Sequence, residues 1–271
     1  MSQPPRVLVV AGSDSGGGAG IQADIKTLSA MGVYAMTAVT AITVQNTLGV
    51  SDVHAIPPDV VAAQMRACLD DIGADAIKLG MLHSAPLIEA VAAVLGDFPE
   101  IPVIADPVMV AKGGAALLQS EAVGALATHI LPRATVITPN TEEAAVLTGT
   151  PIADETEQEA AAIALAERFQ AAVLLKGGHL SGATVLNLLL QPGRPLERYA
   201  SPRLDTRHTH GTGCTLASAI AAGVAAGLPL SAAVERACRF VHEGIANAPG
   251  FGQGHGPIDH LSTRFRLEPD G

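Results

Sequence analysis

The sequence predicts an α/β protein with a mainly parallel sheet and helices on both faces of that sheet. Short continuous apolar runs, typical of buried parallel strands, alternate along the chain with longer segments of helical periodicity. Most connections between these segments are short. No internal repeat, low-complexity linker or block of like charge interrupts the alternation. We therefore expect a single domain over residues 1–271.

The expected elements follow one another from the N-terminus. Strands are predicted over residues 7–11, 35–45, 50–56, 76–80, 103–106, 136–138 and 172–175. Helices are predicted over residues 21–31, 57–72, 86–96, 121–129, 155–170, 215–226 and 229–248. Residues 184–190 and 196–201 flank a Gln-Pro-Gly-Arg-Pro turn, so we expect them to form a small hairpin at the edge of the sheet.

Composition and charge exclude several classes of protein. The net charge of −10 argues against nucleic acid as a partner. An odd count of three cysteines without a CxxC motif argues against a disulfide framework or a zinc site. Neither a signal peptide nor a membrane-spanning segment is predicted, so we expect a cytoplasmic enzyme without a membrane partner. Only 15% of residues are charged, which favours a homodimer or a higher homo-oligomer.

A glycine-rich turn directly before the predicted helix 215–226 is the strongest local signal. Gly211 and Gly213 permit backbone turns that a side chain would forbid. The unpaired N–H groups and the positive dipole end of the helix would bind an anion such as phosphate. Cys214 lies in the first helical turn, where the same field should lower the pKa of its thiol. These features predict phosphoryl transfer; the alternative is a tight turn with Cys214 as a small core residue.

Other polar groups occur where predicted strands end. Residues 12–20 form a glycine-rich loop between a strand and a helix, a nucleotide-binding layout that matches neither the dinucleotide fingerprint nor the Walker motif. The carboxamide of Gln45 offers a donor and an acceptor, as an aminopyrimidine edge requires, or else caps a turn. Lys176 precedes two glycines and is placed to meet a phosphate. Cys68 and Cys238 fall on helices and are assigned to the core.

Three hard oxygen ligands follow two other strands. They are Asp106, Asn140 and Glu143. Mg²⁺ prefers such ligands and uses few protein carboxylates, so the group predicts a magnesium site. Taken singly, each of the three could instead cap a helix.

Six separated strings resemble one known family over nearly the whole chain. They are GSDSGGGAGIQADIKT, KLGML, DPVMVAKGG, TPNTEEA, THGTGC and GQGHGPIDH. THGTGC resembles the ribokinase-like kinases, and the cysteine in this string resembles the hydroxymethylpyrimidine/phosphomethylpyrimidine kinases of thiamin biosynthesis. The chain departs from the family strings at Ser15-Gly16, where relatives carry Pro-Ser, and at Gly114, which replaces Ser.

The resemblance implies a ribokinase-like three-layer sandwich and a kinase that uses ATP and Mg²⁺. Its substrates would be 4-amino-5-hydroxymethyl-2-methylpyrimidine and then the monophosphate of that compound. Cys214 would take the hydroxyl proton, while Lys176 and Mg²⁺ would neutralise the ATP phosphates. The remaining implied roles are phosphoryl binding by Gly211, Thr212 and Gly213, nucleotide binding by Thr209 and His210, pyrimidine binding by Gly12, Asp24, Gln45, Met81 and Val108, and metal binding by Asp106, Asn140 and Glu143.

Three other functions remain open at this point. A pyridoxal or pyridoxine kinase of the same superfamily acts on a ring that also bears a hydroxymethyl group. A pyrimidine or nucleotide sensor would bind without chemistry, but it would have no need of the lysine, carboxylates and cysteine together. A dinucleotide oxidoreductase is disfavoured by the missing fingerprint.

Overall fold

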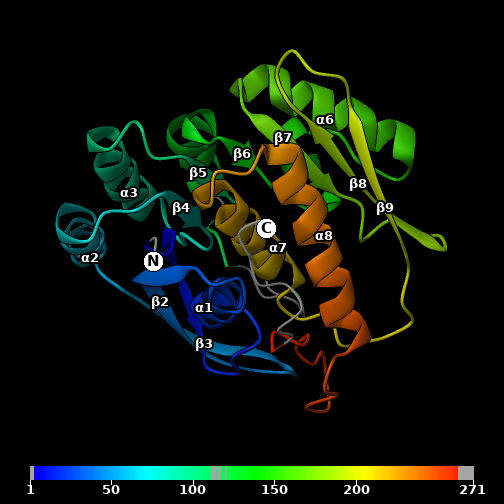
Figure 1. Ribbon diagram of the computed structural model, residues 1–271, viewed down its shortest axis with the longest axis horizontal. Helices are drawn as coiled ribbons and strands as arrows, with labels where there is room; N and C mark the ends of the chain where they lie inside the picture. The colour runs from blue at the N-terminus through cyan, green and yellow to red at the C-terminus, as the bar shows by residue number, and fades with distance from the viewer. Residues whose placement is uncertain (1–2, 111–113, 115–116, 120, 262–271) are drawn as a thin grey trace.

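A twisted central sheet organises the molecule (Figure 1). The computed structural model describes residues 3–110, 114, 117–119 and 121–261. Within them the sheet has nine strands in the order β3-β2-β1-β4-β5-β6-β7-β8-β9. The strands are β1 (Arg6–Asp14), β2 (Tyr34–Asn46), β3 (Gly49–Ala55), β4 (Ala76–Leu79), β5 (Val103–Ala105), β6 (Val136–Ile137), β7 (Ala172–Lys176), β8 (Thr184–Leu190) and β9 (Glu197–Pro202).

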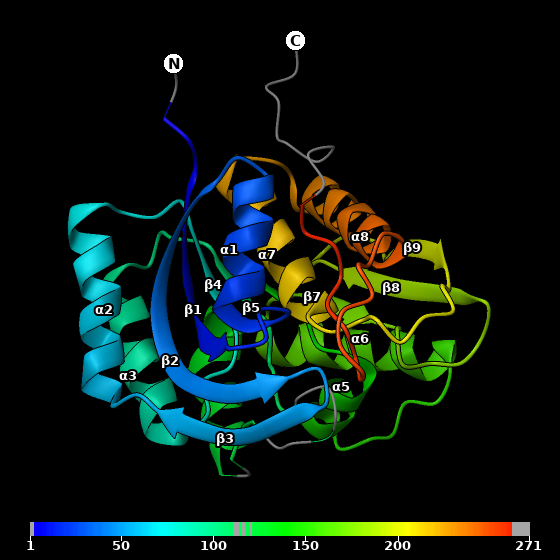
Figure 2. The same cartoon turned by 90° about the horizontal axis from the view of Figure 1, so that it is seen from below.

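Direction changes only at the two edges of the sheet. The six neighbouring strands β2, β1, β4, β5, β6 and β7 run parallel. At the two edges, β3 pairs antiparallel with β2, and β8 pairs antiparallel with β7. The hairpin of β8 and β9 confirms the predicted edge hairpin. At the opposite edge, the longer β2–β3 ribbon curves along the molecule (Figure 2). All six parallel strands therefore end at one side of the sheet, where α/β proteins bind ligands.

Helices cover both faces, which confirms the predicted three layers. The helices are α1 (Gly20–Ala30), α2 (Pro58–Asp71), α3 (Ala85–Asp97), α4 (Ala122–Ala125), α5 (Thr141–Thr148), α6 (Glu155–Phe169), α7 (Thr212–Ala225) and α8 (Leu230–Ala246). Alternate residues of β1 point to opposite faces, as strand geometry requires. Leu8 and Val10 join a core with α2, α3 and α6, while Val7 and Val9 join a core with α1, α7 and α8.

Two helical segments differ from the sequence prediction. The segment predicted as one helix over residues 121–129 is α4 followed by a π-turn at Leu126–Ile130 and a 3-10 turn at Leu131–Arg133. Pro132 has no N–H for a continuing α-helix, which explains the irregular end. Helix α5 was not predicted, because eight residues carry too few turns for a clear apolar period.

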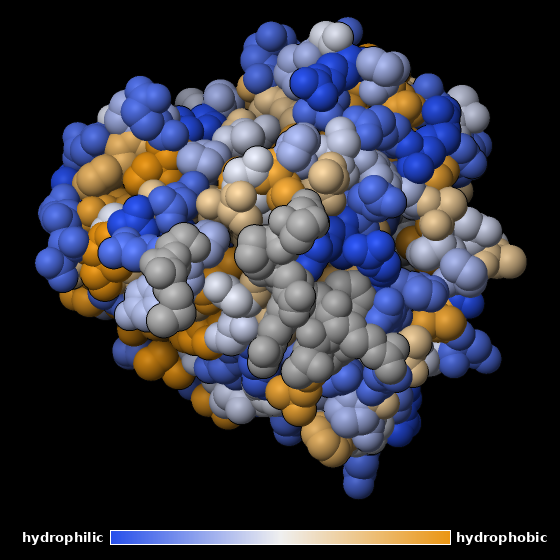
Figure 3. Space-filling view, viewed as in Figure 1, coloured by the Kyte–Doolittle hydropathy of each residue, from blue (hydrophilic) through white to orange (hydrophobic). Residues whose placement is uncertain are grey.

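The surface is mixed in character. On the face seen in Figure 1, hydrophilic residues gather over α6, and hydrophobic residues gather over α2 and α3 (Figure 3). Helix α2 accordingly carries the exposed side chain of Val60, and the exposed Ile72 directly follows the helix. In the part of the chain that the structure describes, none of the helices is long and apolar enough to cross a membrane.

Candidate active site

A cavity of about 930 Å³ opens where the parallel strands end. All of the predicted site residues lie within the described part of the chain, and every one except Asp24 lines this cavity. The lining set is Gly12, Gln45, Met81, Asp106, Val108, Asn140, Glu143, Lys176, Thr209, His210, Gly211, Thr212, Gly213 and Cys214. These residues come from seven separate stretches of the sequence and meet at one cavity.

The predicted glycine turn is present and opens into this cavity. Gly211 takes a left-handed conformation with φ of 82°, and α7 begins at Thr212. A Cβ atom at Gly211 would lie 1.7 Å from the carbonyl oxygen of Gly18, so only glycine allows this approach. The turn before α7 therefore packs directly against the glycine-rich loop before α1. The first turn of α7 lines the cavity, so the positive end of this helix would attract an anion there. The Thr212 amide donates to the Thr209 carbonyl oxygen at a long 3.5 Å.

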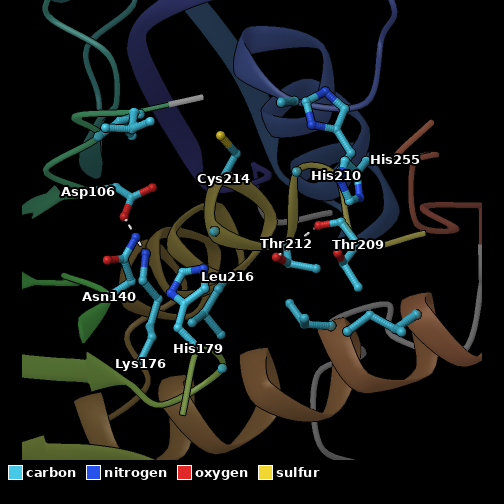
Figure 4. A pocket seen from close by; sticks show the side chains of 18 of the residues that line it. Asp106, Asn140, Lys176, His179, Thr209, His210, Thr212, Cys214, Leu216 and His255 are labelled. Carbon is cyan, nitrogen blue, oxygen red and sulfur yellow. Dashed lines mark hydrogen bonds and ion pairs between the residues drawn. The ribbon is translucent and has the colours of Figure 1, made fainter. Parts of the chain in front are cut away.

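Cys214 lies half-buried in the first turn of α7 and lines the cavity (Figure 4). Burial raises its pKa to about 11, while the ammonium group of Lys78 and the backbone N–H of Gly20 oppose the shift. The carboxylates of Asp24 and Asp106 raise the pKa further. The predicted lowering is therefore wrong for the free protein, because desolvation outweighs the helix field.

Asp24 is not on the cavity wall, which corrects its predicted role in pyrimidine binding. Both of its carboxylate oxygens lie 2.9 Å from the Nζ atom of Lys78, and the hydroxyl of Ser218 donates to Oδ1 at 2.7 Å. The Lys78 and Asp24 side chains are both 0% exposed. This buried pair joins α1, β4 and α7. Lys78, to which the sequence analysis assigns no role, lines the cavity.

A second lysine–aspartate pair lies at the ends of β5 and β7. Lys176 donates to Asp106 Oδ1 at 2.8 Å (Figure 4). Thr138 donates to the same oxygen at 2.9 Å. Glu143 Oε2 lies 4.0 Å from Lys176 Nζ. Burial alone would lower the pKa of Lys176, but the two carboxylates raise it, so the ammonium group stays charged. Two carboxylates for one ammonium leave this part of the cavity net negative.

The predicted metal ligands divide into two kinds. Asn140 and Glu143 form a capping box at the start of α5, each side chain accepting from the other's backbone N–H at 2.8 Å. Asn140 is thus a helix cap, the alternative left open above. Burial, reinforced by the charge of Asp106, raises the pKa of Glu143 to about 7. The carboxylates of Asp106 and Glu143 repel each other, so a cation that they share with a bound polyphosphate would suit them. The described residues contain no cluster of three or more His, Cys, Asp or Glu side chains that could hold a metal ion by themselves.

Part of the cavity has an apolar wall. Met81 packs with Ala41 and Leu117, and Val108 contacts this small cluster. A Cβ atom at Gly12 would lie 3.2 Å from the sulfur of Met81, so Gly12 leaves room at the wall. Gln45 lies beside this wall, at the end of β2. The predicted pyrimidine-binding residues other than Asp24 therefore line one cavity, and their role in binding stays a prediction.

His210, which the resemblance places with the nucleotide, contacts Asp14 and Gln45. Its Nε2 atom lies 2.8 Å from Asp14 Oδ2 and 3.3 Å from Gln45 Nε2. Sequence reasoning missed Asp14, although it stands within the first of the six strings.

Cys238 also departs from its predicted assignment. It packs against the core, as expected, but it lines the cavity as well, together with Val241 and His242 of α8. Burial raises the pKa of its thiol to about 11. The amphipathic pattern of α8 does not distinguish a residue facing the core from one facing a cavity.

Comparison with known proteins gives relatives of the same size and one longer relative. The chain is 49% identical to a hydroxymethylpyrimidine/phosphomethylpyrimidine kinase from Streptomyces coelicolor over 257 residues, covering 95% of this chain and 94% of that protein. It is also 49% identical to the thiamine biosynthesis bifunctional protein ThiED from Geobacter sulfurreducens over 255 residues, which is 94% of this chain. The match spans only 52% of that longer protein.

Solved structures share the fold over most of the chain. A pyridoxal kinase from Staphylococcus aureus, in complex with AMP-PCP and pyridoxal, superposes with a TM-score of 0.89 at 33% identity, covering 98% of this chain and 97% of that one. A phosphomethylpyrimidine kinase from Clostridium difficile superposes with a TM-score of 0.78 at 35% identity, covering 89% and 99%. The sheet and its helices are therefore a ribokinase-like fold, as the six strings implied.

The family model for phosphomethylpyrimidine kinase matches residues 14–259, and this span contains the turn before α7, the Lys176 pair and most of the apolar wall. The chain therefore belongs to the phosphomethylpyrimidine kinase family.

Proposed function

We propose that this protein transfers the γ-phosphoryl group of ATP to 4-amino-5-hydroxymethyl-2-methylpyrimidine and then to the resulting monophosphate. One observation carries the proposal: an apolar wall, a thiol and a helix N-terminus with a nearby lysine meet in a single cavity. The wall suits a flat ring, and the helix N-terminus suits the transferring phosphoryl group. The names of the relatives agree with this pair of reactions.

Phosphoryl transfer depends mainly on positioning and on neutralising charge. The amides of Gly211, Thr212 and Gly213 would bind the transferring group, and Lys176 would neutralise the phosphates. Lys176 is 14% exposed, so its ammonium group can leave Asp106 for a phosphate oxygen without entering the core.

Cys214 is placed to accept the hydroxyl proton of the first acceptor. Its thiol keeps its own proton in the free protein, because burial raises its pKa. The groups that favour the thiolate are Lys78, the Gly20 amide and the field of α7. The pKa is raised even with Lys78 and the Gly20 amide in place, so the base role requires that the bound nucleotide and its cation lower this pKa further.

Asp106 and Glu143 fit Mg²⁺ by their chemistry and charge. When bound with the nucleotide, the ion would neutralise negative charge on the phosphates. Glu143, with a pKa raised to about 7, would bind the ion in its ionised form. Asn140 would contribute indirectly, by holding the Glu143 backbone at the start of α5.

A pyridoxal kinase activity is the second candidate, because a solved structure of 33% identity is such an enzyme in complex with pyridoxal. Both rings are flat and carry a hydroxymethyl group, so the apolar wall suits either. We expect kcat/KM to be higher for the hydroxymethylpyrimidine than for pyridoxal. A clear preference for pyridoxal would overturn the assignment.

The decisive experiment mixes the protein with ATP, Mg²⁺ and a limiting amount of the pyrimidine. We expect two ADP molecules to form for each pyrimidine consumed. One ADP would limit the proposal to the first step, and none would favour a sensor without chemistry. The predicted homo-oligomer remains a proposal, to be tested by the mass of the protein in solution.

A further inference from the structure

A chain of polar side chains connects the glycine-rich loop before α1 to Gln45. Asp14 Oδ2 lies 2.8 Å from His210 Nε2, and His210 Nε2 lies 3.3 Å from Gln45 Nε2. At the other side of the amide, Thr43 Oγ1 lies 3.1 Å from Gln45 Oε1 and 2.9 Å from the carbonyl oxygen of Ser13. Asp14, at one end of this series of hydrogen bonds, determines which atom donates and which accepts in each of them.

Asp14 fixes the first direction. Its carboxylate accepts from the backbone N–H groups of Gly16 at 2.8 Å, Gly18 at 3.1 Å and Ala19 at 2.8 Å. Burial would raise its pKa, but His210 and these amides lower it below the usual value, so the group is ionised. An ionised carboxylate can only accept, and the proton between Asp14 and His210 therefore lies on Nε2.

That proton conflicts with the amide orientation described above. A protonated Nε2 cannot accept from the Gln45 amino group, so two donors would face each other at 3.3 Å. Thr43 has a single hydroxyl proton, which cannot serve both Ser13 O and Gln45 Oε1 fully. Exchanging the oxygen and nitrogen of the Gln45 amide removes both conflicts. The single Nε2 proton of His210 then points mainly to Asp14 at 2.8 Å, with the Gln45 oxygen as a second, longer acceptor at 3.3 Å. Gln45 donates to Thr43, and Thr43 donates to Ser13. Such exchanges are decided by the hydrogen-bond network.

We propose that Asp14 and His210 are positioning residues that hold the Gln45 carboxamide with its oxygen toward His210 and its nitrogen toward Thr43. The consequence for specificity rests on the proposed function. A 4-aminopyrimidine edge presents a donor on its amino group and an acceptor on the adjacent ring nitrogen. A 4-oxopyrimidine presents the same two positions with donor and acceptor exchanged. A fixed amide matches one order and leaves the other with unpaired polar groups, which costs affinity. Asp14 and His210 therefore determine which ring the enzyme accepts.

The first test needs no substrate. In the ¹⁵N spectrum of the histidine rings, His210 should be protonated at Nε2 and bare at Nδ1 in the wild-type protein. In Asp14→Asn this preference should be lost, since an amide can donate to Nε2 as well as accept from it. A wild-type ring protonated at Nδ1 alone would overturn the proposal. This measurement decides the positioning role even if neither pyrimidine is phosphorylated.

The second test measures discrimination between rings as the ratio of kcat/KM for the 4-amino substrate and its 4-oxo analogue. We expect this ratio to fall about tenfold or more in Asp14→Asn, mainly through KM, as a loss of about 1.4 kcal/mol in discrimination. His210→Phe keeps a ring of similar size, removes the donor and should show the same fall, which covers the case in which Asp14→Asn does not fold.

A matched control separates this role from support of the loop. Lys26 donates to the Gly17 carbonyl at 2.7 Å, in the same loop that Asp14 organises, but it has no contact with Gln45. Lys26→Met should leave the ratio within about twofold of wild type. If the ratio is unchanged in both Asp14→Asn and His210→Phe, or falls as far in Lys26→Met, the proposal fails.

Discussion

The two lysine–aspartate pairs of this protein share a chemistry and differ in their surroundings. Lys78 and Asp24 are both 0% exposed, whereas Lys176 is 14% exposed and faces a second carboxylate, that of Glu143. Both oxygens of Asp24 accept hydrogen bonds from Lys78, and one of them also accepts from the hydroxyl of Ser218. The first pair is a closed unit that holds α1, β4 and α7 together. The second is an open unit that can exchange a partner for a phosphate.

The comparison shows that residue type alone does not decide whether a charged residue at a strand end stabilises the fold or binds a ligand. Both lysines follow apolar residues at the ends of parallel strands, and both reach the cavity. Only the partners supplied by other elements distinguish them. A buried pair that is broken leaves an unpaired charge in the core, while a pair at a cavity can be compensated by water.

The largest effect is expected from breaking the closed pair. Lys78→Met leaves the buried Asp24 carboxyl without its partner, and should lower the free energy of unfolding by about 3–5 kcal/mol. The double variant Lys78→Met/Asp24→Leu removes both charges and should recover about half of that loss or more. Urea unfolding of the two variants measures the difference. If Lys78→Met unfolds like wild type, the pair does not hold the three elements together.

A smaller effect is expected at Cys214, which lies in the field of both pairs. Cys214→Ser should slow the first phosphorylation by at least about tenfold, because a positioned base contributes roughly 10²–10⁴ in rate. The second acceptor is a phosphate monoester with a second pKa of about 6, already an anion at neutral pH, and this step should change only a few-fold.

Following the two phosphorylations separately in single-turnover reactions checks this asymmetry. The variant Cys238→Ser is a matched control, since this thiol also lines the cavity but lies on α8. Equal losses in both steps would assign Cys214 to phosphoryl binding and remove its base role.

The smallest effect concerns the pH dependence of the open pair. The pKa of Glu143 is raised to about 7 in the folded protein, above its ordinary value of 4.5. Between pH 4.5 and 7 the folded state therefore holds a proton that the unfolded state releases, and stability falls as pH rises through this window. Glu143→Gln keeps the cap acceptor and removes the titration.

Unfolding in urea at pH 5 and pH 8 should thus show a smaller loss of stability for Glu143→Gln than for wild type. Mg²⁺ with ATP should reduce the wild-type loss, because a bound cation stabilises the ionised carboxylate. An identical pH dependence in the two proteins would show that Glu143 ionises normally.

Much of the fold and most of the site could be predicted from the sequence. Buried parallel strands have continuous apolar sequences, so the bounds of β1 and β7 could be predicted to within a few residues. The cavity residues follow strand ends, and the parallel arrangement brings strand ends together. Gly211 was recognisable because only glycine allows the observed turn.

The errors share a physical cause, which is the depth at which a side chain is buried. Asp24 and Cys214 occur in recognisable strings, but the burial of Asp24 and the desolvation of the Cys214 thiol depend on how α1 packs against α7. Local sequence does not encode the distance from Asp24 to Lys78, which are 54 residues apart. For the same reason, Asp14 and His210, 196 residues apart, could not be recognised as partners.

The most direct test of the division between the two pairs is a matched pair of substitutions, Lys176→Met and Lys78→Met, each measured for kcat/KM and for unfolding in urea. We expect Lys176→Met to lose roughly 10²-fold or more in kcat/KM, by analogy with the loss of one transition-state donor, and to change the free energy of unfolding by about 1 kcal/mol or less. Lys78→Met should show the larger loss of stability. Full turnover by Lys176→Met at saturating ATP, or a loss of stability as large as that of Lys78→Met, would contradict the account.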